Sequence, residues 1–333
     1  MANNIFGIDL GTNNIKIYNR GDDSIMVEKN MIAIENKKNL FAYGDSAYEM
    51  YEKAPGNIQI SYPLCNGVIA DIHNMETLVR YFITDLSKGA IKPADFYIAV
   101  PTDVTEVEKR AFYDLIRDAG VKAKRIMIVE KAVADGLGLD IDVKNAQGVL
   151  VVNVGYDTTE VSILSLGGIG LIKVGGLKFD DAIRAAVRKE FSLLIGGKTA
   201  ENVKFALAEL EKEGKGAQVF GRDIVTGLPV EREIPTSLVD SCLTENFNMI
   251  IDNVKVILER TPPELAADIY RHGIYLTGGA SQVNHLAELI SLGTGLKVNV
   301  AAEPMNSVVL GIAKIIKDDN YKSVAYSIEG MSK

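Results

Sequence analysis

Two short segments of the chain carry polar residues in a pattern that suits phosphate binding. Residues 7–18 read GIDLGTNNIKIY and residues 152–163 read VNVGYDTTEVSI. In each segment an apolar strand ends at an acid or an amide, and a glycine and a polar turn precede a second strand. Such turns present backbone N–H groups to phosphate oxygens, and glycine lets the backbone approach closely. The pattern therefore predicts two phosphate-binding turns.

The side chains in these segments predict how a triphosphate and its metal would be held. Asp9 is expected to hold a magnesium ion through water, because magnesium loses its own waters reluctantly. Thr12 and Thr158 offer hydroxyl groups, and two turns that face each other could clamp a β,γ-diphosphate. A third segment, LTGGASQ at 276–282, is a Gly-Gly turn expected to open a helix from about Gln282. It could accept the adenosine or the α-phosphate.

The composition limits the class of protein. A chain of 333 residues is too long for one typical core, so we expect two domains. The net charge of −8 argues against a nucleic-acid partner, which needs clustered Lys and Arg. Neither a signal peptide nor an apolar run of membrane-spanning length is evident, which favours the cytoplasm. The cysteines and histidines show no metal-ligand spacing, and we expect a structural role for His73, His272 and His285.

Apolar periodicity and turn residues predict an α/β chain whose pattern restarts halfway along. The first half has expected strands at 4–9, 15–18, 95–100 and 125–129 and expected helices at 68–86, 105–119 and 130–137. Thr105 and Glu108 form a capping-box pattern at the start of one helix. The second half has expected strands at 148–153, 160–166 and 168–174 and expected helices at 179–190, 199–213 and 235–259. The repeat indicates two similar halves, unless it is a coincidence between two ordinary hairpins.

With these motifs in place, the sequence resembles the MreB/Mbl family of bacterial actins, within the superfamily of actin, sugar kinases and heat-shock-70 proteins. GIDLGTNN resembles the first phosphate motif and LTGGA the adenosine motif of that family. Further segments resemble family-specific stretches: PLCNGVIAD, VPTDVTEVEKRA, LLIGGKTAENVK, GRDIVTGLP and TPPELAADI. The resemblance runs nearly end to end, and the last four of these separate the family from kinases and chaperones.

The resemblance implies an α/β actin-like ATPase fold, in which duplicated ribonuclease H-like domains form four subdomains around a nucleotide cleft. The implied boundaries are 1–32, 66–146 and 313–333 for subdomain IA, 33–65 for IB, 147–181 and 246–312 for IIA, and 182–245 for IIB. It also implies ATP and Mg²⁺ as ligands and a homopolymer in which subunits stack head to tail, because a heterologous contact that does not close gives an open filament.

The resemblance also assigns the nucleotide site. Glu201 and Lys204 would hold the ribose and base, although from spacing alone they are a solvated helix face with i,i+3 charges. The implied nucleotide-binding residues are Gly11, Thr12, Asn13, Asn14, Gly155, Tyr156, Asp157, Glu201, Lys204, Gly278, Gly279, Ala280 and Ser281. The metal positions are Asp9 and Asn153, and the positions near the reacting phosphate are Glu130, Lys131 and Thr158.

Several of these positions depart from the family pattern. The second phosphate loop typically reads DIGGGTTE, whereas here Asn153 replaces its Asp and Tyr156 and Asp157 replace glycines. Leu177 stands where a family Asp is expected, which puts the nucleotide-sensing contacts of that segment in question. Lys131 falls on the Glu that orients the attacking water.

A charged lysine cannot accept a proton from water, but it could pair with the γ-phosphate. Loss of a well-placed base costs about 100- to 10,000-fold in rate. We therefore expect ATP binding with slowed hydrolysis through Lys131, and the alternative is tolerated drift in a working ATPase.

The resemblance extends to partners and location. The family's membrane loop corresponds to residues 87–93, with Ile91 at its tip between Lys88 and Lys92. Two cations near anionic lipid contribute about 2 kcal/mol, so we expect weak, lipid-dependent association with the inner face of the membrane at best. Divergent family members with altered sites are typical of wall-less helical mollicutes of the spiroplasma type. That likeness favours a role in helicity and swimming, with paralogous subunits or other cytoskeletal ribbon proteins as partners.

Three functional hypotheses follow. The first is a nucleotide-dependent polymer with weak ATPase activity that supports cell shape and motility. The second is an ordinary rod-shape ATPase that guides morphogenesis. The third, from another class, is a sugar kinase or a chaperone ATPase domain, which would need a sugar-facing carboxylate or a substrate-binding domain that no segment resembles.

Overall fold

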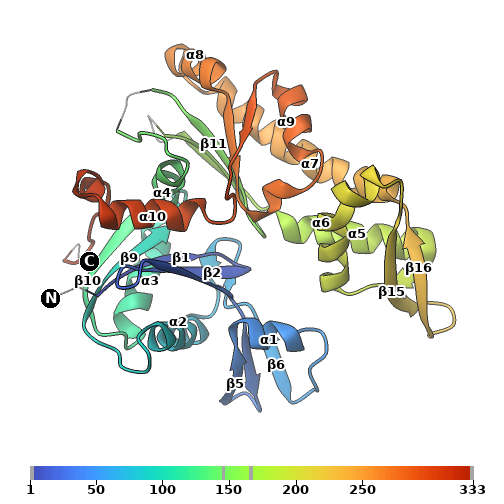
Figure 1. Cartoon of the computed structure of the whole chain (residues 1–333), viewed down its shortest axis with the longest axis horizontal. Coiled ribbons are helices and arrows are strands. Elements are labelled where there is room, and N and C mark those ends of the chain that lie inside the picture. The colour runs from blue at the N-terminus through green and yellow to red at the C-terminus, as the bar shows by residue number, and fades with distance from the viewer. Residues whose placement is uncertain (1–3, 145–146, 165–167, 331–333) are drawn as a thin grey trace. The chain divides into compact units, whose positions relative to one another are not determined.

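The computed structural model describes residues 4–144, 147–164 and 168–330, and the chain divides into two compact units (Figure 1). The first unit consists of Met1–Ala146 and Met305–Lys333, and the second of residues 147–304. The chain thus returns to the first unit at Met305. The predicted boundary after residue 312 is wrong, because it would divide the helix Ser307–Lys317, which packs in the first unit. The finer division into subdomains stays a prediction.

The first unit contains a five-stranded mixed sheet with the order β10-β9-β1-β2-β3. Its strands are β1 (Ile5–Leu10), β2 (Asn14–Asn19), β3 (Ser24–Lys29), β9 (Ala94–Val100) and β10 (Ala123–Glu130). β1 pairs antiparallel with β2 but parallel with β9, and β9 pairs parallel with β10. The carboxyl ends of β1, β9 and β10 therefore lie at one edge of the sheet.

Helices cover both faces of this sheet (Figure 1). Phe6 and Ile8 of β1 pack with α2 (Ile72–Leu86) and α3 (Glu106–Asp118). Residues between them point to the other face, since side chains alternate along a strand. There Gly7 lies against Ile312 of α10 (Ser307–Lys317), which packs beside α4 (Lys131–Gly138). Asp9 shares this second face by the same alternation.

A smaller three-stranded sheet and short elements complete the first unit. The sheet has the order β5-β4-β6 and packs against α1 through Met31, Ala33 and Ala47. The elements are β4 (Ile32–Glu35), β5 (Asn39–Tyr43), α1 (Gly44–Met50), β6 (Ile58–Ser61), β7 (Leu64–Cys65), β8 (Val68–Ile69) and the 3₁₀ helix η2 (Asp319–Val324).

Two helix starts in this unit test the sequence predictions. The capping box of Thr105 and Glu108 is confirmed, with both reciprocal hydrogen bonds present. The helix predicted from residue 68 begins only at Ile72, so that prediction was wrong at its start. Asp71 caps it by accepting a hydrogen bond from the Asn74 N–H, and Val68–Ile69 pairs with β7 instead.

The second unit repeats the architecture of the first. Its five-stranded sheet has the order β13-β12-β11-β17-β18, with β11 antiparallel to β12 and parallel to β17. Its strands are β11 (Leu150–Val154), β12 (Thr159–Ile163), β13 (Gly168–Ile172), β17 (Ile274–Thr277) and β18 (Val298–Val300). The predicted strand at 160–166 ends at Ile163, and residues 165–167 lie outside the described part. The repeated order and directions confirm the predicted duplication and exclude a coincidence of hairpins.

The remaining elements of the second unit form two groups (Figure 1). The large core cluster joins the sheet to α7 (Thr236–Glu259), α8 (Pro263–His272) and α9 (Leu286–Thr294). A three-stranded sheet of the order β14-β15-β16 accompanies α5 and α6. These elements are α5 (Gly176–Phe191), β14 (Leu193–Leu194), α6 (Gly197–Lys212), β15 (Ala217–Asp223) and β16 (Pro229–Ile234).

Close packing of α4 and α10 gives a test of the first unit. A Cβ atom on Gly311 would overlap the carbonyl oxygen of Ala134, a backbone atom that cannot rotate away. We expect Gly311→Ala to lower the free energy of unfolding of this unit by about 1–3 kcal/mol or more. Chemical unfolding followed by circular dichroism measures the change. Gly56→Ala is the control, because its Cβ would meet nothing within 4 Å; equal unfolding midpoints for the two variants would contradict the packing argument.

Candidate functional site

The first predicted phosphate turn closes at the end of β1. The Gly11 N–H donates to the Asn14 carbonyl oxygen at 3.0 Å. The fully buried Asn30 supports the turn, because its N–H donates to the Asn13 carbonyl and its side-chain amide donates to the Gly11 carbonyl, both at 2.9 Å. The Lys29 ammonium donates to the Asn13 side chain at 3.2 Å. Sequence reasoning missed Asn30, which gives no local signal because its contacts come from another strand.

The second predicted turn closes in the same way. The Gly155 N–H donates to the Thr158 carbonyl oxygen at 2.9 Å. The start of α5 then binds this turn, because the Gly176 N–H donates to the Gly155 carbonyl and the Leu177 N–H to the Tyr156 carbonyl, at 3.0 and 2.6 Å. Leu177 makes this contact through its backbone, so its departure from the family Asp leaves the hydrogen bond in place.

The residues beside the two turns differ in charge. Asp9 pairs with Lys16 across the strands, and the Lys16 ammonium donates to the Asp9 carboxylate at 2.9 Å with both side chains buried. At the equivalent place Asn153 pairs with Glu160. Directly opposed like charges destabilise a strand pair, so an amide at Asn153 avoids the repulsion that Asp would have with Glu160. The sequence analysis did not identify Lys16, although a lysine between two apolar strand residues indicates that its charge has a partner.

The third predicted segment forms a tight turn against β11. Gly278 has φ +89°, and its N–H donates to the Pro304 carbonyl at 2.8 Å. A Cβ on Gly278 would lie 2.6 Å from the Asn153 side-chain oxygen. The helix predicted from about Gln282 starts later than predicted, at Leu286. Gly279–Gln282 is a 3₁₀ helix (η1), closed by the Ser281 hydroxyl donating to the Gly278 carbonyl, and α9 starts at Leu286.

Four predicted segments of the second unit meet at Gly176. A Cβ at this position would lie 3.3 Å from Ala280 Cβ, 3.3 Å from Lys204 Nζ and 3.7 Å from the Tyr156 carbonyl oxygen. A Cβ on the preceding Gly175 would lie 2.6 Å from the Gly155 carbonyl oxygen. The glycines thus allow the phosphate turn, the Gly-Gly turn and α6 to approach the start of α5, and this unit brings its candidate residues together.

Lys204 is buried and forms an ion pair, so the interpretation of a solvated helix face is wrong for this residue. Its ammonium donates to the Asp180 carboxylate at 2.7 Å and to the Gly176 carbonyl at 3.3 Å, and its exposed fraction is 1%. Burial raises the pKa of Asp180 to about 6, against the lowering effect of the Lys204 charge. Glu201, one turn earlier on α6, is half-buried. A role of this pair with ribose and base stays a prediction.

Lys131 and Glu130 lie at the carboxyl edge of the first sheet. β10 ends at Glu130, α4 begins at Lys131, and both side chains are half-buried. Glu130 is in register with Val100 of β9, whose neighbour Ala99 is in register with Asp9. Strands are about 4.8 Å apart, so two strand spacings place Lys131 about 10 Å from the end of β1. A cation on the positive end of a helix dipole attracts an anion to this edge.

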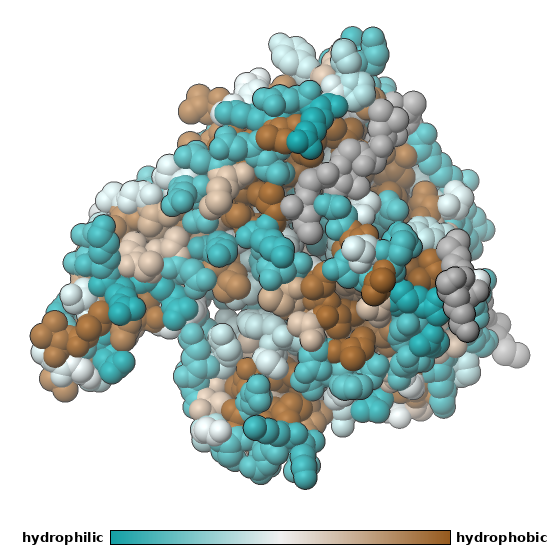
Figure 2. Space-filling view, turned by 180° about the vertical axis from the view of Figure 1, so that it is seen from behind, coloured by the Kyte–Doolittle hydropathy of each residue, from teal (hydrophilic) through white to brown (hydrophobic). Residues whose placement is uncertain are grey.

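The surface gives limited support for membrane contact. Among the described residues, no helix combines the length and the apolar character that crossing a bilayer requires. On the face in Figure 2, apolar side chains lie in separate patches among polar ones. Ile91 in the candidate membrane loop is half-buried, and its carbonyl accepts a hydrogen bond from Lys122 at 3.0 Å.

The duplicated sheets, each with a glycine-closed turn after its first strand, define an actin-like fold. The family model of the MreB/Mbl protein matches residues 3–323. The cell shape-determining protein Mbl of Bacillus subtilis is 34% identical over 312 residues, which cover 92% of this chain and 93% of Mbl. The chain therefore belongs to the MreB/Mbl family.

Solved structures agree with this assignment. The crystal structure of MreB5 of Spiroplasma citri bound to ADP is 34% identical, with a TM-score of 0.88 and coverage of 97% of this chain and 98% of that chain. Its AMPPNP-bound counterpart is 33% identical, with a TM-score of 0.89 and the same coverage.

The buried pair of Asp180 and Lys204 gives a pH-dependent prediction. Because the pKa of Asp180 is about 6 in the folded chain and 3.8 ordinarily, its stabilising contribution is complete below about pH 4 and is lost as the pH rises through about 6. Relative to Asp180→Asn, the wild type should lose on the order of 1–3 kcal/mol between pH 4 and 7. Urea unfolding across that range measures this difference.

The control for this measurement is the neighbouring residue Asp181, whose side chain is half-exposed. Asp181→Asn should keep the wild-type pH dependence. If Asp180→Asn and Asp181→Asn followed the same profile, the burial of Asp180 would not be the cause.

Proposed function

We propose that this chain binds ATP with Mg²⁺ and assembles into actin-like filaments that support cell shape. The observation that carries the proposal is the repeated turn. In each unit a glycine N–H at the end of the first strand closes onto a carbonyl three residues later, at 3.0 Å for Gly11 and 2.9 Å for Gly155. Turns of this kind direct backbone N–H groups at phosphate oxygens, and one relative of about one-third identity, MreB5 of Spiroplasma citri, has crystal structures with ADP and with AMPPNP bound.

The proposed nucleotide contacts are assigned in each unit by itself. In the first, Gly11, Thr12, Asn13 and Asn14 contact phosphate, and Asp9 orders the waters of Mg²⁺ while Lys16 holds its carboxylate. In the second, residues 155–158 contact the phosphates. The adenosine side consists of Glu201, Lys204, Gly278, Gly279, Ala280 and Ser281. Asn153 near the metal contributes an amide oxygen instead of a charge.

Hydrolysis of ATP is slow in this proposal. Lys131 occupies the first residue of α4 at the carboxyl edge of β1, β9 and β10. A protonated amine there attracts the terminal phosphate but accepts no proton from the attacking water. Neighbouring Glu130 is the last residue of its strand, and Thr158 positions phosphate through its hydroxyl group. The second candidate, a fully active rod-shape ATPase, differs from this proposal in the rate of phosphate release.

Assembly is proposed as a head-to-tail homopolymer in the cytoplasm, with a four-subdomain actin arrangement. A contact between different surfaces of successive subunits propagates without closing. The relative Mbl of Bacillus subtilis is a cell shape-determining protein. A further role in helicity and swimming, with paralogous subunits or other ribbon proteins, is part of the proposal. Contact with the inner face of the membrane through Ile91 is weak, because that side chain is half-buried.

Electron microscopy of the purified protein tests the assembly. With Mg²⁺ and ATP, or with a non-hydrolysable analogue, the chain should form filaments because assembly depends on binding and not on hydrolysis. The measurement is filament number and length as a function of protein concentration. Dispersed particles at all concentrations with ATP, in a protein shown by calorimetry to bind ATP, would refute the polymer proposal.

The role of Lys131 is tested by steady-state phosphate release. Lys131→Glu should raise turnover about 10-fold or more, because a carboxylate can orient and deprotonate water. If Asn153 also limits the rate, only the double variant with Asn153→Asp will show the rise. Lys124→Glu on β10, the strand that precedes α4, is the control for charge, since Lys124 is exposed. A wild-type rate that neither the single nor the double variant exceeds would contradict the proposal.

A further inference from the structure

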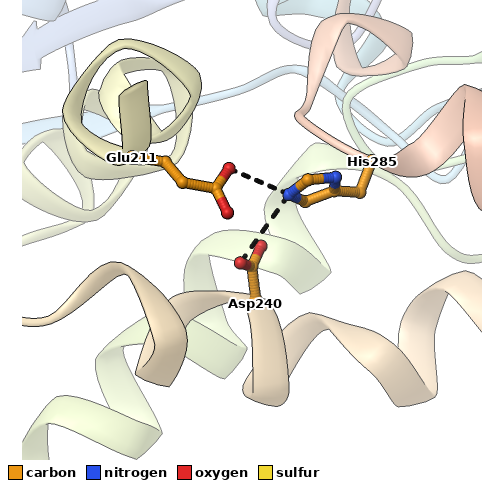
Figure 3. A group of neighbouring side chains, drawn as sticks. All are labelled: Glu211, Asp240 and His285. Atoms are coloured by element: carbon orange, nitrogen blue, oxygen red, sulfur yellow. Dashed lines mark hydrogen bonds and ion pairs between the residues drawn. The ribbon is translucent and has the colours of Figure 1, made fainter. Parts of the chain in front are cut away.

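Three side chains from separate elements of the second unit converge on one point (Figure 3). Glu211 lies near the C-terminal end of α6, Asp240 lies in the first half of α7, and His285 directly precedes α9. One ligand atom from each lies within 4.8 Å of the other two. His285 was predicted to be structural, because residues so far apart in the chain show no metal-ligand spacing.

The distances in this cluster suit a tetrahedral metal site. The His285 Nε2 atom lies 3.0 Å from Glu211 Oε2 and 3.8 Å from Asp240 Oδ2. Zinc takes imidazole nitrogen and carboxylate oxygen at about 2.0–2.1 Å, so ligand atoms in a tetrahedron are about 3.3 Å apart. The two measured distances bracket that value. We propose that Glu211, Asp240 and His285 bind one divalent transition-metal ion of the zinc class, with water as the fourth ligand.

The groups around the three ligands support this assignment. Metal-binding histidines almost always place their second ring nitrogen against a carboxylate, carbonyl or water. Here the His285 Nδ1 atom lies 3.4 Å from a Glu288 carboxylate oxygen, and Nε2 faces Glu211 Oε2 at 3.0 Å. The Asn284 amide nitrogen lies 2.9 Å from Nε2, so it must turn away from this ring atom when the metal binds. The Asn284 amide donates to Glu211 Oε2 at 2.7 Å and orients that carboxylate. The ring and one ligand carboxylate are therefore each held by a neighbouring side chain.

The cluster also carries an excess of negative charge that a divalent cation would neutralise. Glu211, Asp240 and Glu288 bring three carboxylates to one imidazole, and even a protonated ring would balance only one of them. Asp240 and His285 are half-buried, where unbalanced charge is more costly than in water. A divalent ion would neutralise the excess and tie the end of α6 to α7 and to the segment after η1. The competing interpretation is an ion pair between imidazolium and carboxylates without a metal.

Cobalt(II) titration of the full-length protein tests the proposal, because Co²⁺ is a coloured substitute for zinc. The exposed thiol of Cys65 is removed with Cys65→Ser so that it cannot bind the probe. We expect one Co²⁺ per chain in the presence of excess Mg²⁺, visible bands of a four-coordinate nitrogen and oxygen site, no thiolate band, and displacement by one equivalent of Zn²⁺.

Matched variants locate the site. Glu211→Gln keeps the size of the side chain, and His285→Asn tolerates the φ of +64° at this position. Each should weaken Co²⁺ binding at least 100-fold and remove the bands. A circular dichroism spectrum equal to that of the parent protein shows that each variant is folded. His73→Ala is the control, because His73 lies beside Glu76 but is highly exposed. It should bind Co²⁺ as the parent does.

Two results would overturn the proposal. Absence of Co²⁺ and Zn²⁺ binding in the parent protein would leave an ion pair only. Equal binding in the parent, Glu211→Gln and His285→Asn would place the metal elsewhere.

Discussion

The hydrogen bond that closes the turn after the first strand of each sheet is the constraint on which the rest of this site depends. It forces the chain to reverse at Gly11 and at Gly155, so that the turn N–H groups collect at the carboxyl edge of the strands. Segments that pack against these turns must therefore come close to backbone atoms rather than to side chains. Gly175 and Gly278 supply that approach in the second unit, where a Cβ would contact carbonyl or amide oxygens.

The duplicated frame carries different charges in its two halves. In the first unit the buried acid Asp9 is compensated by Lys16. In the second unit the equivalent acid is replaced by Asn153, opposite the buried Glu160. The buried pair of Lys204 and Asp180 then supplies a fixed charge pair beside the glycine-rich start of α5. The substitutions seen at the second turn therefore preserve its backbone geometry while they change its electrostatics.

Much of the fold could be predicted because alternation and glycine-closed turns are local signals. β1, β2, β9, α3 and the duplication follow from them, as does the Thr105 cap. The errors occurred where distant contacts decide the outcome. The Asp71 cap and the β7 pairing shortened α2, and the 3₁₀ helix Gly279–Gln282 stands where the turn leads toward α9, which starts only at Leu286. Asn30 and the cluster at His285 depend on residues from other elements, so no spacing in the sequence could indicate them.

Family membership and fold are established by the match over residues 3–323, whereas the assignment of each side chain to a nucleotide atom rests on the turns. The most direct measurement is a crystal structure of this chain with Mg²⁺ and a non-hydrolysable ATP analogue. The account predicts phosphate oxygens within hydrogen-bond distance of the backbone N–H groups of residues 12–14 and 156–158, with the Lys131 ammonium facing the terminal phosphate. A nucleotide bound away from both turns, or a carboxylate aligning water against the terminal phosphorus, would contradict it.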